Sequence, residues 1–232
     1  MREEPVSTPL RRTKSRFFAK DKARDPATLA SVAAFTTWRL GLQTIKRMRD
    51  ADFEIEASPQ YFDVLGEYLV FLIHVADRFA FARLPLPERR VFTVSMVRRL
   101  AELLAENESR LLGTDADSIR RGFIDRFNAR ADDYATFGFD EASGPDFAFL
   151  RYAGHALLGV VAERDRAWVT DQVMTIEAPD AVTTLRRVMD NVVGTAGSII
   201  SAPTEDGDAA DAGPFPEMPQ VDAPLDDPIP PE

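Results

Sequence analysis

The residues best suited to chemistry in this chain lie between positions 63 and 78, in a segment with helical periodicity. At about 100° per residue, one stripe of such a helix carries the polar side chains Asp63, Glu67, His74, Asp77 and Arg78. Carboxylates and imidazoles can transfer protons or bind a divalent metal. The stripe therefore lines a pocket, or it is a narrow polar face directed at solvent or at a neighbouring helix. The second interpretation is simpler, because apolar Val70 and Phe81 lie on the same stripe.

His155 is the only other histidine, so a histidine-based site would need His74 and His155 to meet. With Glu67 they form the candidate set for a metal or acid–base site. Ferritin-like di-metal proteins carry a Glu-x-x-His pair on each of two helices, and this sequence contains no such pair. We therefore predict no metal, no cofactor and no catalytic residue, and we expect each histidine to be a hydrogen-bonded structural residue.

The sequence also lacks the residues and motifs of several common catalytic and binding sites. The chain has no cysteine, which excludes disulfides, thiolate zinc sites and thiol nucleophiles. It has no Gly-x-Ser-x-Gly elbow, no Gly-x-x-x-x-Gly-Lys loop and no Gly-x-Gly-x-x-Gly turn. Hydrolysis through a nucleophile elbow and nucleotide chemistry through these loops are disfavoured.

The elements that must position these residues are helices. Apolar residues recur at steps of three and four from residue 25 to residue 200, which predicts a single all-α domain, a bundle of about six to seven helices. The predicted starts are Asp25-Pro26, Ser58-Pro59, Pro87, either Thr114 or Asp115, and Asp146, and the predicted stops include Pro85, Gly113 and Pro179.

Between the helices the sequence is less regular. Residues 138–145 read as a loop, and the best strand candidate, residues 53–56, is only four residues long. Gly154 and Gly159 would allow close approach of helices. Adjacent arginines such as Arg89-Arg90 are most simply placed on exposed faces.

Two polar ends of opposite charge flank the helical region in a chain whose formal net charge is −10. Residues 1–24 hold eight basic and three acidic side chains, and residues 202–232 hold nine acidic side chains, eight prolines and no basic residue. Such segments bury too little apolar surface to offset their ordering entropy, so residues 1–24 and 201–232 are predicted to be disordered tails. The partner-binding candidates mix cations with aromatics: Arg11, Arg12, Lys14, Arg16, Phe17, Phe18 and Lys20.

Membrane insertion is not expected. The longest apolar run, residues 64–76, falls short of the about 20 residues that a membrane-spanning helix needs, and Glu67 and His74 interrupt it. The charged residues 21–25 follow Phe17-Phe18 where an export signal would need an apolar core. We expect a cytoplasmic protein.

These observations favour a non-enzymatic helical protein that binds another macromolecule as an adaptor, scaffold or regulator. Its partner is expected to be a protein, and a homodimer is plausible because the apolar stripes are extensive. One alternative is a bundle enzyme or ligand carrier with a carboxylate–histidine site built around Glu67, His74 and His155, with or without a bound metal. Another is an adaptor that touches an anionic membrane or nucleic acid through the basic residues 1–24.

Overall fold

The helices begin at the capping residues that the sequence provides. Asp25, Asp115 and Asp146 each accept a hydrogen bond from the backbone N–H three residues later, at 3.2, 2.7 and 2.8 Å. Such side chains satisfy N–H groups that have no partner within the first turn. Gly113 ends the third helix in the left-handed conformation, with φ 74°, which glycine adopts without strain. These predicted boundaries are confirmed.

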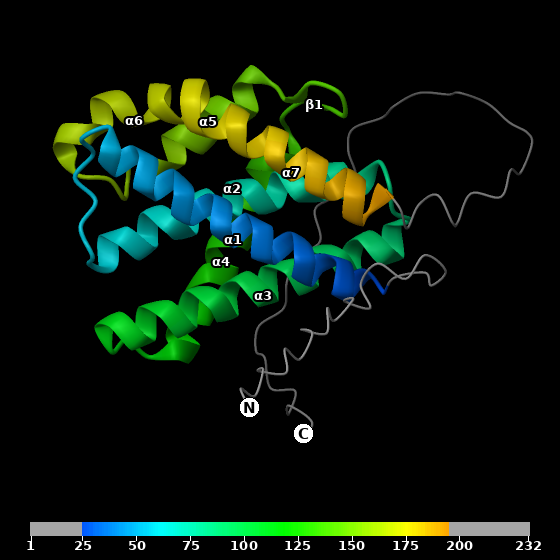
Figure 1. Cartoon of the computed structure of the whole chain (residues 1–232), viewed down its shortest axis with the longest axis horizontal. Helices are drawn as coiled ribbons and strands as arrows, with labels where there is room; N and C mark the ends of the chain where they lie inside the picture. The colour runs from blue at the N-terminus through cyan, green and yellow to red at the C-terminus, as the bar shows by residue number, and fades with distance from the viewer. Residues whose placement is uncertain (1–24, 195–232) are drawn as a thin grey trace, which may run out of the picture.

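The computed structural model describes residues 25–194 of the chain (Figure 1). In chain order its elements are α1 (Pro26–Asp50), α2 (Pro59–Phe81), α3 (Leu86–Leu112), α4 (Ala116–Ala135), β1 (Phe139–Asp140), β2 (Gly144–Pro145), α5 (Phe147–Leu157), the 3₁₀ turn η2 (Glu163–Asp165), α6 (Arg166–Gln172), the π-helical turn η3 (Val173–Glu177) and α7 (Ala178–Val192). The predicted all-α bundle of six to seven helices is confirmed.

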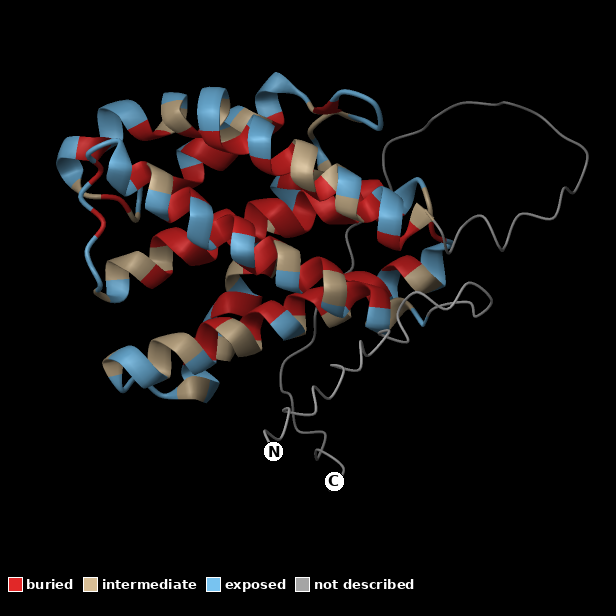
Figure 2. Ribbon diagram, viewed as in Figure 1, coloured by how far each residue is buried: buried red, intermediate tan, exposed pale blue. Residues whose placement is uncertain are grey.

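Helix α2 lies at the centre of the bundle. It packs against α1, α3, α4, α5 and α7 (Figure 1), and all but a few of its residues are buried (Figure 2). A helix that is buried around most of its circumference must find protein partners for every charge it carries. The partners of the four buried charged or titratable side chains of α2 therefore matter most for this fold; these side chains are Glu67, His74, Asp77 and Arg78.

The predicted helix stop at Pro179 is wrong. Pro179 does not stop a helix, because α6, η3 and α7 follow one another without a break. Proline lacks an N–H donor and its ring crowds the carbonyl one turn earlier. Here the wider π turn of residues 173–177 ends two residues before Pro179, so the change in hydrogen-bond register falls where proline would interrupt an α-helix.

The predicted loop at residues 138–145 contains a small antiparallel hairpin. Phe139 pairs with Pro145 and Asp140 pairs with Gly144. The Asp140 carboxylate accepts hydrogen bonds from the backbone N–H groups of residues 142 and 143, at 3.0 and 2.8 Å. Gly144 takes φ 87°, which a side chain would strain. Residues 53–56, the best strand candidate in the sequence, form no strand.

Gly154 brings α5 against α6, as its sequence context predicted. A methyl group added there would lie 2.8 Å from the Cα of Thr170, too close for a backbone contact. We expect Gly154→Ala to lower the free energy of unfolding by about 2 kcal/mol, since overpacking outweighs the better helix propensity of alanine. Urea denaturation measures this value.

Gly159→Ala is the matched control for this prediction. No atom lies within 4 Å of the position that its new methyl group would take, and the expected change is within about 0.5 kcal/mol. Equal effects of the two substitutions would contradict a close α5–α6 contact at Gly154.

Within residues 25–194 no helix combines the length and the apolar character that crossing a membrane would require.

Candidate partner-binding groove and the buried charges of helix α2

The polar stripe of α2 is buried against its neighbours. The exposed fractions of Glu67, His74, Asp77 and Arg78 are 7%, 1%, 0% and 4%. Of the two directions expected for a narrow polar face, solvent or a neighbouring helix, these four residues take the second. The stripe instead meets α3 and α4, which supply partners for its charges.

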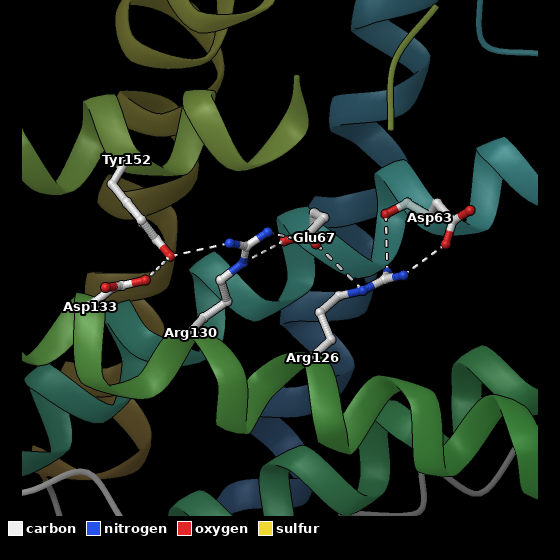
Figure 3. Close-up of polar contacts among 6 residues, drawn as sticks. All are labelled: Asp63, Glu67, Arg126, Arg130, Asp133 and Tyr152. Atoms are coloured by element: carbon white, nitrogen blue, oxygen red, sulfur yellow. Dashed lines mark hydrogen bonds and ion pairs between the residues drawn. The ribbon is translucent and has the colours of Figure 1, made fainter. Parts of the chain in front are cut away.

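Two arginines of α4 hold Glu67 in place (Figure 3). Arg130 donates to the two carboxylate oxygens at 3.2 and 3.4 Å, and the Nε of Arg126 lies 3.5 Å from Oε1. Arg126 also bonds the Asp63 carboxylate at 2.7 Å and its backbone oxygen at 3.2 Å. Gly66 leaves room for this guanidinium, since a methyl group at that position would collide with Nη1 of Arg126.

The same network continues to α5 through Tyr152. Arg130 Nη1 donates to the Tyr152 hydroxyl at 3.3 Å, and that hydroxyl donates to the Asp133 carboxylate (Figure 3). Burial alone would lower the pKa of Arg130, but its bonds to Glu67 and Tyr152 outweigh burial and raise that pKa. Arg130 thus remains a cation, and Glu67 is committed to an ion-pair network that joins α2, α4 and α5.

Asp77 forms the most deeply buried ion pair of the described chain. Arg89 of α3 binds both oxygens of its carboxylate, one of them through Nε at 3.0 Å, and Thr93 donates to the same group at 2.5 Å. The Arg89 guanidinium also lies 5.1 Å from the ring centre of Phe81. Arg89 is 1% exposed, so its predicted place on an exposed face is wrong: the charge pairs with a carboxylate twelve residues earlier.

Arg78 caps the C-terminal end of α4. Its Nη2 donates to the carbonyl oxygens of Tyr134 and Ala135, at 2.8 and 3.1 Å. The last carbonyls of a helix have no partner within it and carry partial negative charge, so a guanidinium is well placed there. Burial lowers the pKa of Arg78, and Asp77 opposes this effect.

His74 is enclosed by aromatic rings. Its ring stacks on Phe127 at 4.8 Å and on Tyr134 at 4.4 Å between ring centres. Neither ring nitrogen has a hydrogen-bond partner, so the expected hydrogen-bonded histidine is instead a stacked one. Burial, and secondly the charge of Arg78, lower the pKa of His74 to about 3. The ring is therefore neutral near pH 7.

The structure does not assemble the candidate set of Glu67, His74 and His155. His74 lies inside the bundle, whereas His155 is exposed on α5, and Glu67 is bound by arginines. Among residues 25–194 no group of three or more histidine, aspartate or glutamate side chains is arranged to hold a metal ion. The alternative of a carboxylate–histidine site gains no support from this geometry.

Glu177 and Asp165 are buried carboxylates that the sequence pattern did not indicate. Glu177, at the end of the π turn, is 0% exposed, and Arg47 of α1 binds it at 2.6 Å. Gln172 donates to its carboxylate at 3.1 Å, and the Tyr68 hydroxyl donates to its backbone oxygen at 3.1 Å. The nearby Pro179 was the available signal, because proline inside a helical pattern marks irregular backbone that can redirect a side chain.

A groove is lined by residues of α1, of the start of α2 and of the end of α3. We call it the Trp38 groove, and its volume is about 330 Å³. Leu42 and Leu111 are 36% and 58% exposed at its edges, while Trp38 is 8% exposed. The lining residues are Trp38, Leu42, Arg49, Ala57, Tyr61, Phe62, Leu65, Asn107, Arg110 and Leu111.

The Trp38 groove is electropositive as well as apolar. Its lining contains Arg49 and Arg110, both exposed, and no carboxylate. The Arg49 guanidinium lies 5.2 Å from the ring centre of Tyr61 and donates to the backbone oxygen of Ile55, which holds it at the groove edge. The exposed apolar side chains Leu42 and Leu111 thus lie in the same groove as two exposed cations, a combination that complements apolar and acidic side chains.

A second cleft, of about 450 Å³, lies between the α1–α2 connection and α6. Asp52, Arg164 and Asp165 line it beside Trp168, which is 67% exposed. Asp165 accepts a hydrogen bond from the backbone N–H of Glu54 at 2.8 Å, so this carboxylate ties the connection to η2. The charged side chains of this cleft are two carboxylates and one guanidinium, so its lining is acidic on balance.

The predicted partner-binding residues between Arg11 and Lys20, and both predicted tails, residues 1–24 and 201–232, lie outside the described residues 25–194. The homodimer stays a prediction.

Comparisons of the chain with protein-family models, with characterised proteins and with solved structures gave no match.

Proposed function

We propose that this chain is a non-enzymatic, cytoplasmic binding protein whose Trp38 groove receives a segment of a partner protein. The segment carries an aromatic or large aliphatic side chain flanked by carboxylates. The observation that carries this proposal is the lining of the groove: an apolar floor with two exposed arginines and no acidic side chain. Apolar burial would supply most of the affinity, and the arginines would select acidic partners.

The buried charges of α2 support a non-enzymatic role. Glu67 and Asp77 each bind arginine and are closed off from solvent. His74 is neutral near pH 7 and covered by rings. A general acid or base must reach a substrate proton within hydrogen-bonding distance. Side chains buried among structural partners are better suited to fixing helix positions than to proton transfer.

Reversing one charge of the groove tests the proposal. The probe is a labelled synthetic peptide in which aspartates flank a Pro-Phe-Pro core, titrated by fluorescence anisotropy. We expect Arg110→Glu to weaken its binding about tenfold, since an attractive contact becomes a repulsive one. Raising the salt concentration should weaken binding to the parent chain as well.

Arg90→Glu is the matched control, because Arg90 is exposed on the same helix but near its other end. It makes the same change in net charge and should leave the affinity almost unchanged. Equal losses in both variants would show a general charge effect and would contradict specific binding in the groove.

A further inference from the structure

The chain itself contains a segment with the chemistry that the Trp38 groove selects. Residues 202–232 carry nine carboxylates and no basic side chain, and Phe215 is their only aromatic residue. Phe215 stands in Pro-Phe-Pro-Glu-Met-Pro, residues 214–219. Proline restricts φ and favours extended backbone, and proline-rich segments bind grooves lined by aromatic rings.

The groove offers the matching surface. Trp38, Tyr61 and Phe62 line it with aromatic rings, and Arg49 and Arg110 line it with cations that would attract a carboxylate. The second cleft is a poorer match, because Asp52 and Asp165 in its lining repel an acidic segment. Charge complementarity therefore selects one of the two clefts.

The chain is long enough to make this contact. Helix α7 ends at the opposite end of the bundle from the start of α2 (Figure 1). Residues 195–213 can span at most about 60 Å, at about 3.3 Å per residue. Helix α1, with 25 residues, is about 37 Å long at 1.5 Å per residue. The maximum span of residues 195–213 is therefore longer than helix α1, which runs along the bundle.

We propose that residues 214–219 occupy the Trp38 groove in the free protein, with Phe215 on the aromatic floor and Glu217 toward the arginines. This inference rests on the proposed function of the groove. The segment competes with a partner and sets the affinity that the partner must reach. A tethered segment acts at an effective concentration of about 1 mM, so one that binds with a Kd of about 0.1 mM reduces apparent partner affinity roughly tenfold.

Distance measurement in the full chain tests the contact directly. Because the chain has no cysteine, Gln43→Cys beside the groove and Gln220→Cys beyond the segment introduce two unique spin-label sites without changing the charge. Pulsed electron paramagnetic resonance should show one dominant short distance. Phe215→Ala and Arg110→Glu should each broaden it and shift it to longer values, whereas Ile229→Ala and Arg90→Glu should not.

Competition separates this inference from the function on which it rests. In the full chain, Phe215→Ala should increase affinity for the labelled Pro-Phe-Pro peptide roughly tenfold. Equal peptide affinity in parent and variant, with a broad distance distribution in both, would overturn the occupation by residues 214–219 and leave the groove function standing. Absence of peptide binding to either, with the same broad distribution, would overturn both.

Discussion

Asp77→Asn is expected to lower the free energy of unfolding by about 3–5 kcal/mol, the usual cost of breaking a buried ion pair. Asp77 and Arg89 are 0% and 1% exposed and share two contacts. Removing the carboxylate charge leaves the guanidinium inside the bundle without its counter-ion. Chemical denaturation followed by circular dichroism measures the loss, which is a large part of the stability of an ordinary domain.

A double variant keeps this prediction testable if the single one does not fold. Asp77→Leu combined with Arg89→Met removes both charges and should recover most of the loss, since apolar replacement of a buried pair is often neutral. The exposed pair of Lys46 and Asp50 is the control, and Asp50→Asn should change stability by less than about 1 kcal/mol. A small effect of Asp77→Asn would mean that water reaches the pair.

The second large effect concerns pH. His74 has its pKa lowered from 6.5 to about 3, by burial first and then by Arg78. Between these values the unfolded chain binds a proton that the folded chain does not, so the free energy of unfolding falls as pH decreases. The slope is about 1.4 kcal/mol per pH unit for this one group. Its stabilising contribution is complete above pH 6.5 and is lost progressively toward pH 3.

His74→Leu should remove this dependence. Near pH 7 the variant should match the parent within about 1 kcal/mol, because the lost ring stacking is offset by removing two buried nitrogens that lack hydrogen-bond partners. At about pH 4.5 the parent should have lost about 2–3 kcal/mol more than the variant. Taking the difference between the two proteins cancels the titration of the carboxylates.

His155→Gln is the control for the pH experiment. It removes the exposed histidine and keeps the buried one, so the slope below pH 6.5 should persist. Parallel stability curves for the parent and His74→Leu would mean that the His74 ring accepts a proton in the folded state, and would contradict its enclosure by Phe127 and Tyr134.

Much of the fold could be predicted because its signals are local. A capping aspartate such as Asp115 satisfies N–H groups within one turn, and Gly113 ends a helix through its own backbone freedom. Pro179 was misread because its effect depends on the π turn before it, which local propensity does not show.

The candidate site was predicted only in part. Helical periodicity correctly grouped Glu67, His74 and Asp77 on one stripe, because that geometry is internal to one helix. Asp77 pairs with Arg89 and Glu67 pairs with Arg130. Because these arginines lie on other helices, the periodicity of one helix could not predict the two ion pairs. The Trp38 groove was missed for the same reason, since three helices contribute to it.

By itself the sequence determined which segments coil, where they start and which face of each is apolar, because contacts within a turn or two decide these features. It also determined the opposite charges at the two ends. Because it contains no cysteine, it excluded disulfides, thiolate zinc sites and thiol nucleophiles. The tertiary structure alone decided that Asp77 meets Arg89, that His74 is closed in by rings and that Trp38 faces an open groove. Each of these depends on how helices far apart in the chain are packed, and burial then sets the free energy of every charge among them.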